Sequence, residues 1–406
     1  MEFESDTVVF EEFGQESEKD LSISPEQFSQ AVLWGTDWTT ETIMRQLHRG
    51  NIDVNPRFQR RNAWKKEQKS KFIESIILGI PVPPVILAER KDRPNSFIVI
   101  DGKQRLLSIR QFSAEENEEY DQLFLKNLEI LKELNGFNYK ELCESPEFNQ
   151  YLTNFDNQTI RAVIIRNWPS EDFLYTVFHR LNTGSLPLSP QELRQALHPG
   201  GFLDYVEVFS SESKPIQRVL NITEPDSRMR DVELVIRFFA FRNFIKHYTG
   251  KLKGFLDETS RALNEKWLDQ QETIRIQARE LEEAILFTQE VFGEKAFRKW
   301  VDGRFSSRFN RAVYDIMVYY FSIPEVRREL RKDLTQVESA FIELCEKDRD
   351  FLQSFEANAS DLKKTVKRYQ TWGEKLSPMV QVALPIPSSD GTKVMVLEGD
   401  VFGANN

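Results

Sequence analysis

The residues best suited to bind a ligand form one run: Asp101, Gly102, Lys103, Gln104 and Arg105. An apolar stretch at 97–100 precedes them, so we expect a strand, a tight turn and then a helix. Asp101 is predicted to cap this helix, with Gln104 reaching back as in a capping box, and Gly102 lets a ligand approach the turn closely. The N–H groups of the first helical turn, with Lys103 and Arg105, favour a phosphate. A capped turn with two solvated bases explains the same residues.

A second run is rich in arginine: Arg57, Phe58, Gln59, Arg60 and Arg61, followed by Trp64. Arginine forms bidentate hydrogen bonds with phosphate oxygens, so three arginines in five residues suggest an anion site. On an extended chain Arg57 and Arg60 would point to opposite faces. The aromatic side chains either pack in the core, which is their commoner fate, or stack on a base.

A third run links a tight loop at 182–184 to a new helix. Ser189, Pro190 and Glu192 have the form of an N-cap, a first helical residue and a capping-box acid. This segment is predicted to join two domains, and Asn182 in its loop could also reach a ligand.

Several common catalytic patterns are missing from the sequence. It contains no GxxxxGK[ST], GxGxxG, HExxH, CxxC or GxSxG motif, and its four histidines lack metal-ligand spacing. The ordinary P-loop, dinucleotide, zinc-protease and nucleophile-elbow sites are therefore excluded.

The elements around these runs change in type along the chain. Apolar periodicity predicts helices at 41–49 and 66–78 and strands at 85–87, 97–100 and 161–165. Further on it predicts helices at 231–248, 273–292, 310–321 and 337–355. We therefore expect an acidic N-terminal arm over 1–34, an α+β domain over 35–188, an all-helical domain over 189–375 and a C-terminal tail over 376–406. The tail either adds an edge strand or stays mobile.

The composition is that of a soluble protein of two or three domains. The chain has 406 residues, a net charge of −10 and two cysteines, which fits a reducing, cytoplasmic compartment and no membrane partner. The charge is segregated: residues 41–110 carry +8, while 1–30 carry −8 and 111–150 carry −7. The basic segment is either an anion-binding surface or lies across from the acidic ones.

Taken together, the three runs resemble one known family, the N-terminal domain of GmrSD-type modification-dependent restriction enzymes. The resemblance rests on Arg57-Phe58-Gln59-Arg60 with Trp64, Gly-x-Pro-x-Pro-Pro at 79–84, Asp101-Gly102-Lys103-Gln104-Arg105, and the segment 178–194. It covers about residues 40–200 well and continues loosely to about 260.

This resemblance implies a ParB/sulfiredoxin-like fold, nucleotide binding with NTP hydrolysis, and a link to defence against foreign DNA. Asp101 and Gln104 would be the catalytic residues, with Asp101 positioning a metal ion such as Mg²⁺, a water or the ribose. The residues expected to hold GTP, ATP or CTP are Arg57, Gln59, Arg60, Gly102, Lys103, Arg105 and Asn182. Gln104 would also contact the phosphates.

The sequence departs from the family pattern in two ways. Lys103 replaces the usual first glutamine of the signature, which puts hydrolysis in doubt. No histidine follows His247, so an HNH nuclease within these residues is not expected, and a separate nuclease or defence protein would be the partner. Two alternatives stay open: a DNA-binding nuclease of ParB-like type, and a non-catalytic interaction module that has kept the fold.

Overall fold

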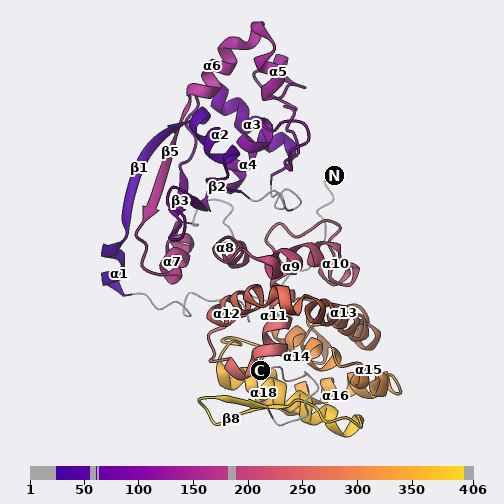
Figure 1. Ribbon diagram of the computed structural model, residues 1–406. Coiled ribbons are helices and arrows are strands. Elements are labelled where there is room, and N and C mark those ends of the chain that lie inside the picture. The colour runs from indigo at the N-terminus through magenta and orange to yellow at the C-terminus, as the bar shows by residue number, and fades with distance from the viewer. Residues whose placement is uncertain (1–23, 55–60, 62–63, 182–188, 397–406) are drawn as a thin grey trace. The chain divides into compact units, whose positions relative to one another are not determined.

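The computed structural model describes residues 24–54, 61, 64–181 and 189–396 (Figure 1). They form two units, one ending at Leu197 and one beginning at His198. We call them the sheet unit and the helical unit. The expected fold class is confirmed, since a mixed sheet near the N-terminus is followed by helices.

The sheet unit is built on five strands in the order β1-β5-β3-β4-β2. They are β1 (Val32–Thr39), β2 (Ile52–Asp53), β3 (Val85–Glu89), β4 (Phe97–Asp101) and β5 (Thr159–Arg166). β3 runs parallel to β5 and β2 parallel to β4, while the β1–β5 and β3–β4 pairs are antiparallel. The sheet is therefore mixed, and β4 lies next to its short edge strand.

Helices cover both faces of this sheet. Successive residues of β3 and β4 are buried in turn on opposite sides, so Leu87 and Val99 enter one core while Ala88 and Ile98 enter the other. The first core is closed by α2 (Thr40–His48), α3 (Lys66–Ile77), α4 (Lys103–Phe112), α5 (Tyr139–Cys143) and α6 (Asn149–Asn157). The second is closed by α7 (Glu171–Leu181) and α8 (Pro190–Leu197).

The predicted elements of this unit are present, but its limits differ from those expected. A short helix, α1 (Pro25–Gln30), and the first residues of β1 fall within the stretch predicted to be an acidic arm. The N-terminal half of β1 is exposed, so the sequence there shows no alternation of buried and exposed residues. α8 was expected to open the helical domain, yet Leu193 packs in the second core of the sheet unit.

The helical unit contains ten α-helices among its described residues. They are α9 (Gly201–Glu212), α10 (Lys214–Leu220), α11 (Arg230–Phe244), α12 (Leu252–Glu265), α13 (Trp267–Phe292), α14 (Arg311–Phe321), α15 (Pro324–Leu330), α16 (Leu334–Lys347), α17 (Arg349–Gln353) and α18 (Leu362–Leu376). Every residue of α14 is buried, and α14 lies against α11, α13 and α18. α14 is therefore a central helix of this unit.

Three details of the helical unit depart from the prediction. The helix expected at 337–355 is two helices, because the Asp348 side chain accepts a hydrogen bond from the Phe351 N–H at 2.9 Å and begins α17. A hairpin of β6 (Trp300–Val301) and β7 (Arg304–Phe305) interrupts the helices, and the tail forms another of β8 (Pro387–Ser389) and β9 (Val394–Val396). Strands of two or three residues are too short to give a periodic signal.

None of the helices in the described ranges combines the length and the apolar character needed to cross a bilayer.

Candidate functional site

The turn from β4 to α4 depends on one glycine. Gly102 is the N-cap of α4 with φ 93° and ψ 14°, in the left-handed region that glycine adopts without strain. A Cβ at this position would lie 2.8 Å from Val85 Cγ1 and 3.1 Å from Arg105 Nη2. Both the backbone and the packing therefore require glycine, and the entrance to the helix carries no side chain at that point.

The prediction that Asp101 caps α4 is wrong. Because Gly102 takes the N-cap position, Asp101 is the last residue of β4, and the N-cap residue provides no side-chain cap. The Arg105 Nη2 group instead donates to Asp101 Oδ2 at 2.7 Å. The predicted capping box is wrong for the same reason: Gln104 Oε1 accepts a long hydrogen bond, 3.4 Å, from the Trp64 N–H.

A buried ion pair connects the signature run to α8. Lys103 Nζ lies 3.1 Å from Glu192 Oε1, and the two side chains are only 9% and 8% exposed. Glu192 also closes the capping box predicted for α8, since Ser189 N–H donates to its Oε2 at 2.7 Å and Ser189 Oγ accepts from the Glu192 N–H at 3.1 Å. One carboxylate thus starts a helix and neutralises a lysine 89 positions earlier.

The C-terminal end of the arginine-rich run lies at the same place. The Trp64 N–H contacts Gln104, while the Trp64 ring packs edge-on against Phe72 at 5.7 Å between centroids. Of the two readings of this aromatic residue, core packing is therefore confirmed. Arg61 is 4% exposed. Four predicted ligand residues lie outside the described residues: Arg57, Gln59, Arg60 and Asn182.

The charges of this candidate site balance one another. Lys103 is matched by Glu192 and Arg105 by Asp101, and three of the four side chains are less than 10% exposed. Cations held in this way are preorganised, because their rotamers are fixed before a ligand arrives. An incoming phosphate would compete with the two carboxylates for these cations. Its affinity would therefore depend on the free energy needed to separate each cation from its carboxylate.

The acidic segment at 111–150 lies across from the basic one at 41–110. Glu118 pairs with Arg110 at 2.8 Å, and the Lys71 ammonium contacts Glu129. For these residues the second reading of the charge pattern is the correct one. For the rest of the basic segment the anion-binding alternative stays a prediction.

A buried lysine in α3 was not predicted. Lys69 is 3% exposed, and its Nζ donates to Gln111 Oε1 at 2.6 Å. Burial lowers the pKa of its ammonium group to about 8, against the opposing charge of Asp121. The available signal was the position of Lys69 three and four residues before Phe72 and Ile73, on the buried stripe of the helix.

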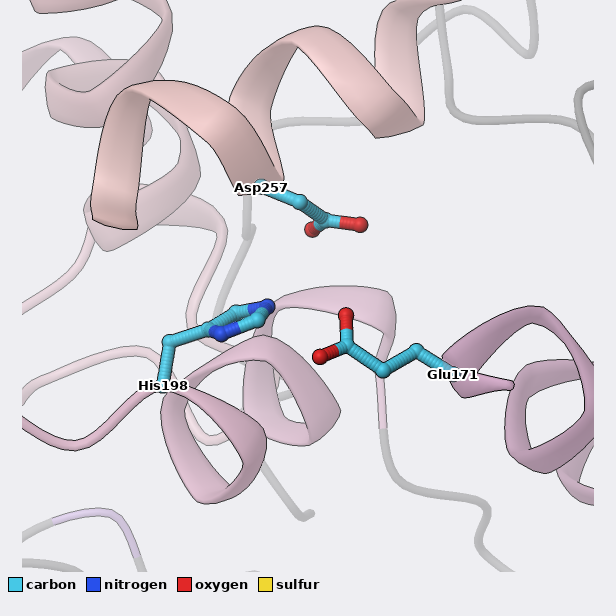
Figure 2. Close-up of side chains that lie close together, drawn as sticks. All are labelled: Glu171, His198 and Asp257. Atoms are coloured by element: carbon cyan, nitrogen blue, oxygen red, sulfur yellow. The ribbon is translucent and has the colours of Figure 1, made fainter. Parts of the chain in front are cut away.

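The helical unit has a buried titratable pair of its own. A ring nitrogen of His198 and a carboxylate oxygen of Asp257 lie within 4.8 Å of each other, as Figure 2 shows. The Lys253 ammonium is 2.8 Å from Asp257 Oδ2 and neutralises it. Glu171, drawn in the same figure, belongs to the sheet unit and is not counted in this pair. The pair by itself supplies too few ligands for a metal ion.

Residues 41–199 match the family model described as the GmrSD restriction endonuclease, N-terminal domain. The predicted resemblance is confirmed over these residues. The match runs from α2 through α8 and includes the β4–α4 turn, Lys103 and Glu192. No curated protein and no solved structure matches the chain.

Proposed function

We propose that the sheet unit binds the phosphates of a nucleoside triphosphate at the β4–α4 turn, and that the protein serves in the restriction of foreign or modified DNA. The second part of the proposal rests on the family match over 41–199. The first part rests on the local geometry of the turn and on the cations around it.

The observation that carries nucleotide binding is the uncapped start of α4 between two buried cations. The N-cap Gly102 has no side chain to accept from the first-turn N–H groups of α4, which carry partial positive charge. Lys103 and Arg105 are both less than 10% exposed, and Gly102 adds no side chain of its own at the start of the helix. Helix N–H groups with two cations suit a phosphate and supply enough contacts for micromolar binding, about −8 kcal/mol.

A divalent cation fits this arrangement through a single protein ligand. Mg²⁺ usually takes one or two carboxylates together with phosphate oxygens and waters. Asp101, at the end of β4 and 21% exposed as a side chain, would hold it. The ion would supply charge neutralisation between the phosphates and this carboxylate.

Binding without rapid hydrolysis is what the Lys103–Glu192 pair favours. A residue at this position that orients a water must keep its polar end directed at the nucleotide. The Lys103 ammonium is instead directed to Glu192 at 3.1 Å. Gln104 contacts the Trp64 backbone, which further reduces the groups available to activate water. On this proposal nucleotide binding regulates the protein, and a separate nuclease cleaves the DNA.

Calorimetric titration with GTP, ATP and CTP, each with and without Mg²⁺, tests the proposal. We expect micromolar binding of at least one nucleotide, and a loss of ten-fold or more in Arg105→Ala, because a charge-assisted hydrogen bond contributes about 1.5–3 kcal/mol. The matched control is Arg161→Ala, which removes an exposed arginine of β5 that pairs with Asp37.

No binding of any of the three nucleotides would refute the proposal. Equal affinities of Arg105→Ala, Arg161→Ala and the unaltered protein would also refute it. Phosphate release from GTP, measured for the unaltered protein and for Lys103→Gln, separates binding from hydrolysis. We expect release to be faster in the glutamine variant.

A further inference from the structure

The β6–β7 hairpin of the helical unit carries an unusual amount of positive charge. Residues 294–311 contain six Lys or Arg and two acids in a chain whose net charge is −10. The hairpin turns at Asp302-Gly303, where both residues have positive φ, 51° and 75°. Two consecutive left-handed residues define a tight turn that matches the twist of the strands. The short ribbon therefore has a definite geometry.

Two further hydrogen bonds extend the ribbon beyond its strands. Ser306 N–H donates to the Lys299 carbonyl at 2.8 Å, and Asn310 N–H donates to the Phe297 carbonyl at 2.8 Å. The segments 297–301 and 304–310 thus run antiparallel along most of their length.

One face of the hairpin anchors it to the helices. Trp300 pairs with Phe305 in the ladder, and their rings meet edge-on at 5.0 Å. Phe305 also contacts Phe292 of α13 at 6.1 Å, and the Trp300 ring N–H donates to Glu346 of α16 at 2.9 Å. These aromatic side chains are engaged within the protein, so we assign them a structural role.

The opposite face and the turn present cations. Val301 and Arg304 are the next pair of the ladder, so their side chains leave the sheet on the other side from Trp300 and Phe305. Arg304 and Arg308 are exposed. Among the described residues, no hydrogen bond or ion pair engages either of these two guanidinium groups. By contrast, Lys299 pairs with Glu356 at 3.1 Å.

We propose that this hairpin binds the phosphate backbone of double-stranded DNA through Arg304 and Arg308. Arginine is well suited to phosphate contacts, and a two-stranded ribbon is narrow enough to follow a groove of the duplex. The choice of DNA as the polyanion rests on the proposed function. The contact would be independent of sequence, because no side chain of the hairpin is placed to read bases.

The test is fluorescence anisotropy of a short mixed-sequence DNA duplex with the full chain, repeated over a series of KCl concentrations. Each phosphate contact contributes about 0.9 to the slope of log K against log [salt]. Arg304→Ala/Arg308→Ala should therefore lower this slope by about 2 and weaken binding by at least about ten-fold near 0.1 M salt. Asp302→Asn, which removes the acid of the turn and keeps a residue tolerant of positive φ, should bind more tightly.

The matched control is Arg279→Ala/Arg328→Ala, which removes the same charge from exposed positions of the same unit. The proposal is overturned if the two double variants bind DNA equally, or if the unaltered protein does not bind duplex DNA. Preference for duplex RNA or for a polyanion such as heparin would also overturn it. Nucleotide titration of the hairpin variant keeps the two proposals apart, since the variant should bind nucleotide normally even if DNA binding fails.

Discussion

Lys103 and Glu192 form an ion pair that connects the two faces of the sheet unit. Lys103 begins α4, whose Leu106 packs in one core, and Glu192 belongs to α8, whose Leu193 packs in the other. The pair lies at the end of β4, where the chain turns through Gly102. A ligand that draws Lys103 away from Glu192 would therefore change the contacts in the first turns of both α4 and α8.

Breaking this ion pair should destabilise the protein more than removing both of its charges. Glu192→Gln leaves the Lys103 ammonium buried beside a neutral group, at a cost of about 3 kcal/mol. Lys103→Gln/Glu192→Gln should recover most of this loss, because two amides can hydrogen-bond to each other. Urea unfolding of the four proteins in a double-mutant cycle measures the coupling. A coupling energy near zero would show that the pair is not formed.

Gly102→Ala should lower the free energy of unfolding by more than Gly136→Ala. Both glycines have φ 93°, so alanine is equally strained at either position, at a cost of about 1–2 kcal/mol. A Cβ at Gly102 meets Val85 Cγ1 at 2.8 Å, whereas nothing lies within 4 Å of one at Gly136. The difference between the free energies of unfolding of the two variants, measured with denaturant, gives the cost of placing a Cβ against Val85 in the closely packed turn. Equal losses would contradict the geometry.

The contribution of Lys69 to the stability of the protein should rise between about pH 8 and 10. Burial lowers the pKa of this ammonium to about 8, below the value of about 10.4 in an unfolded chain. Within that window the unfolded state holds the proton and the folded state does not, so the free energy of unfolding increases with pH. The gain is up to about 3 kcal/mol, and it is complete above the unfolded-state pKa.

Lys69→Met is the reference for this measurement, since it removes the titrating group and keeps an unbranched side chain of similar length. Unfolding curves of both proteins should be collected across the alkaline range. Their difference should change with pH in the predicted direction. Parallel curves would mean that the Lys69 pKa is close to its ordinary value.

The stability of the helical unit should depend strongly on the buried ion pair between Arg237 and Asp315. Arg237 Nε and Nη2 donate to the two Asp315 oxygens at 2.9 and 2.5 Å, and both side chains are at most 1% exposed. Asp315→Asn should cost about 3–5 kcal/mol, because it leaves a guanidinium charge without its main partner.

Glu290→Gln provides the control for the Asp315 variant. Glu290 makes the same bidentate contact with Arg331, at 2.9 and 3.0 Å, but both side chains are more than 40% exposed. Exposed pairs contribute about 0–1 kcal/mol. Thermal unfolding should therefore separate the two variants clearly, and a similar loss in both would contradict the burial of Asp315.

One of the two cysteines should react in the folded protein. Cys143 is exposed and Cys345 is buried, and burial raises the pKa of the Cys345 thiol to about 12. Since the thiolate is the reactive form, a colorimetric thiol reagent should titrate one group in native protein and two in denaturant. Rapid reaction of both thiols under native conditions would contradict this assignment.

The sequence by itself determined the type and position of several elements of the sheet unit. Apolar periodicity located α3, which has one buried side, and short continuous apolar runs located β3 and β4, which are buried on both faces. The turn at Gly102 was readable from its residue types, and so was the capping box of α8, whose hydrogen bonds join residues three positions apart. The family resemblance followed from the order of the same motifs.

Tertiary structure alone decided which charges meet. The sequence could not join Lys103 to Glu192, Lys69 to Gln111 or Arg237 to Asp315, because each pair is more than forty residues apart in the chain. It also misplaced the cap of α4, because the left-handed backbone of Gly102 moved Asp101 out of the capping position and into contact with Arg105. Local patterns fix secondary structure through nearby hydrogen bonds, whereas ion pairs across a core exist only once the sheet and its helices have brought distant residues together.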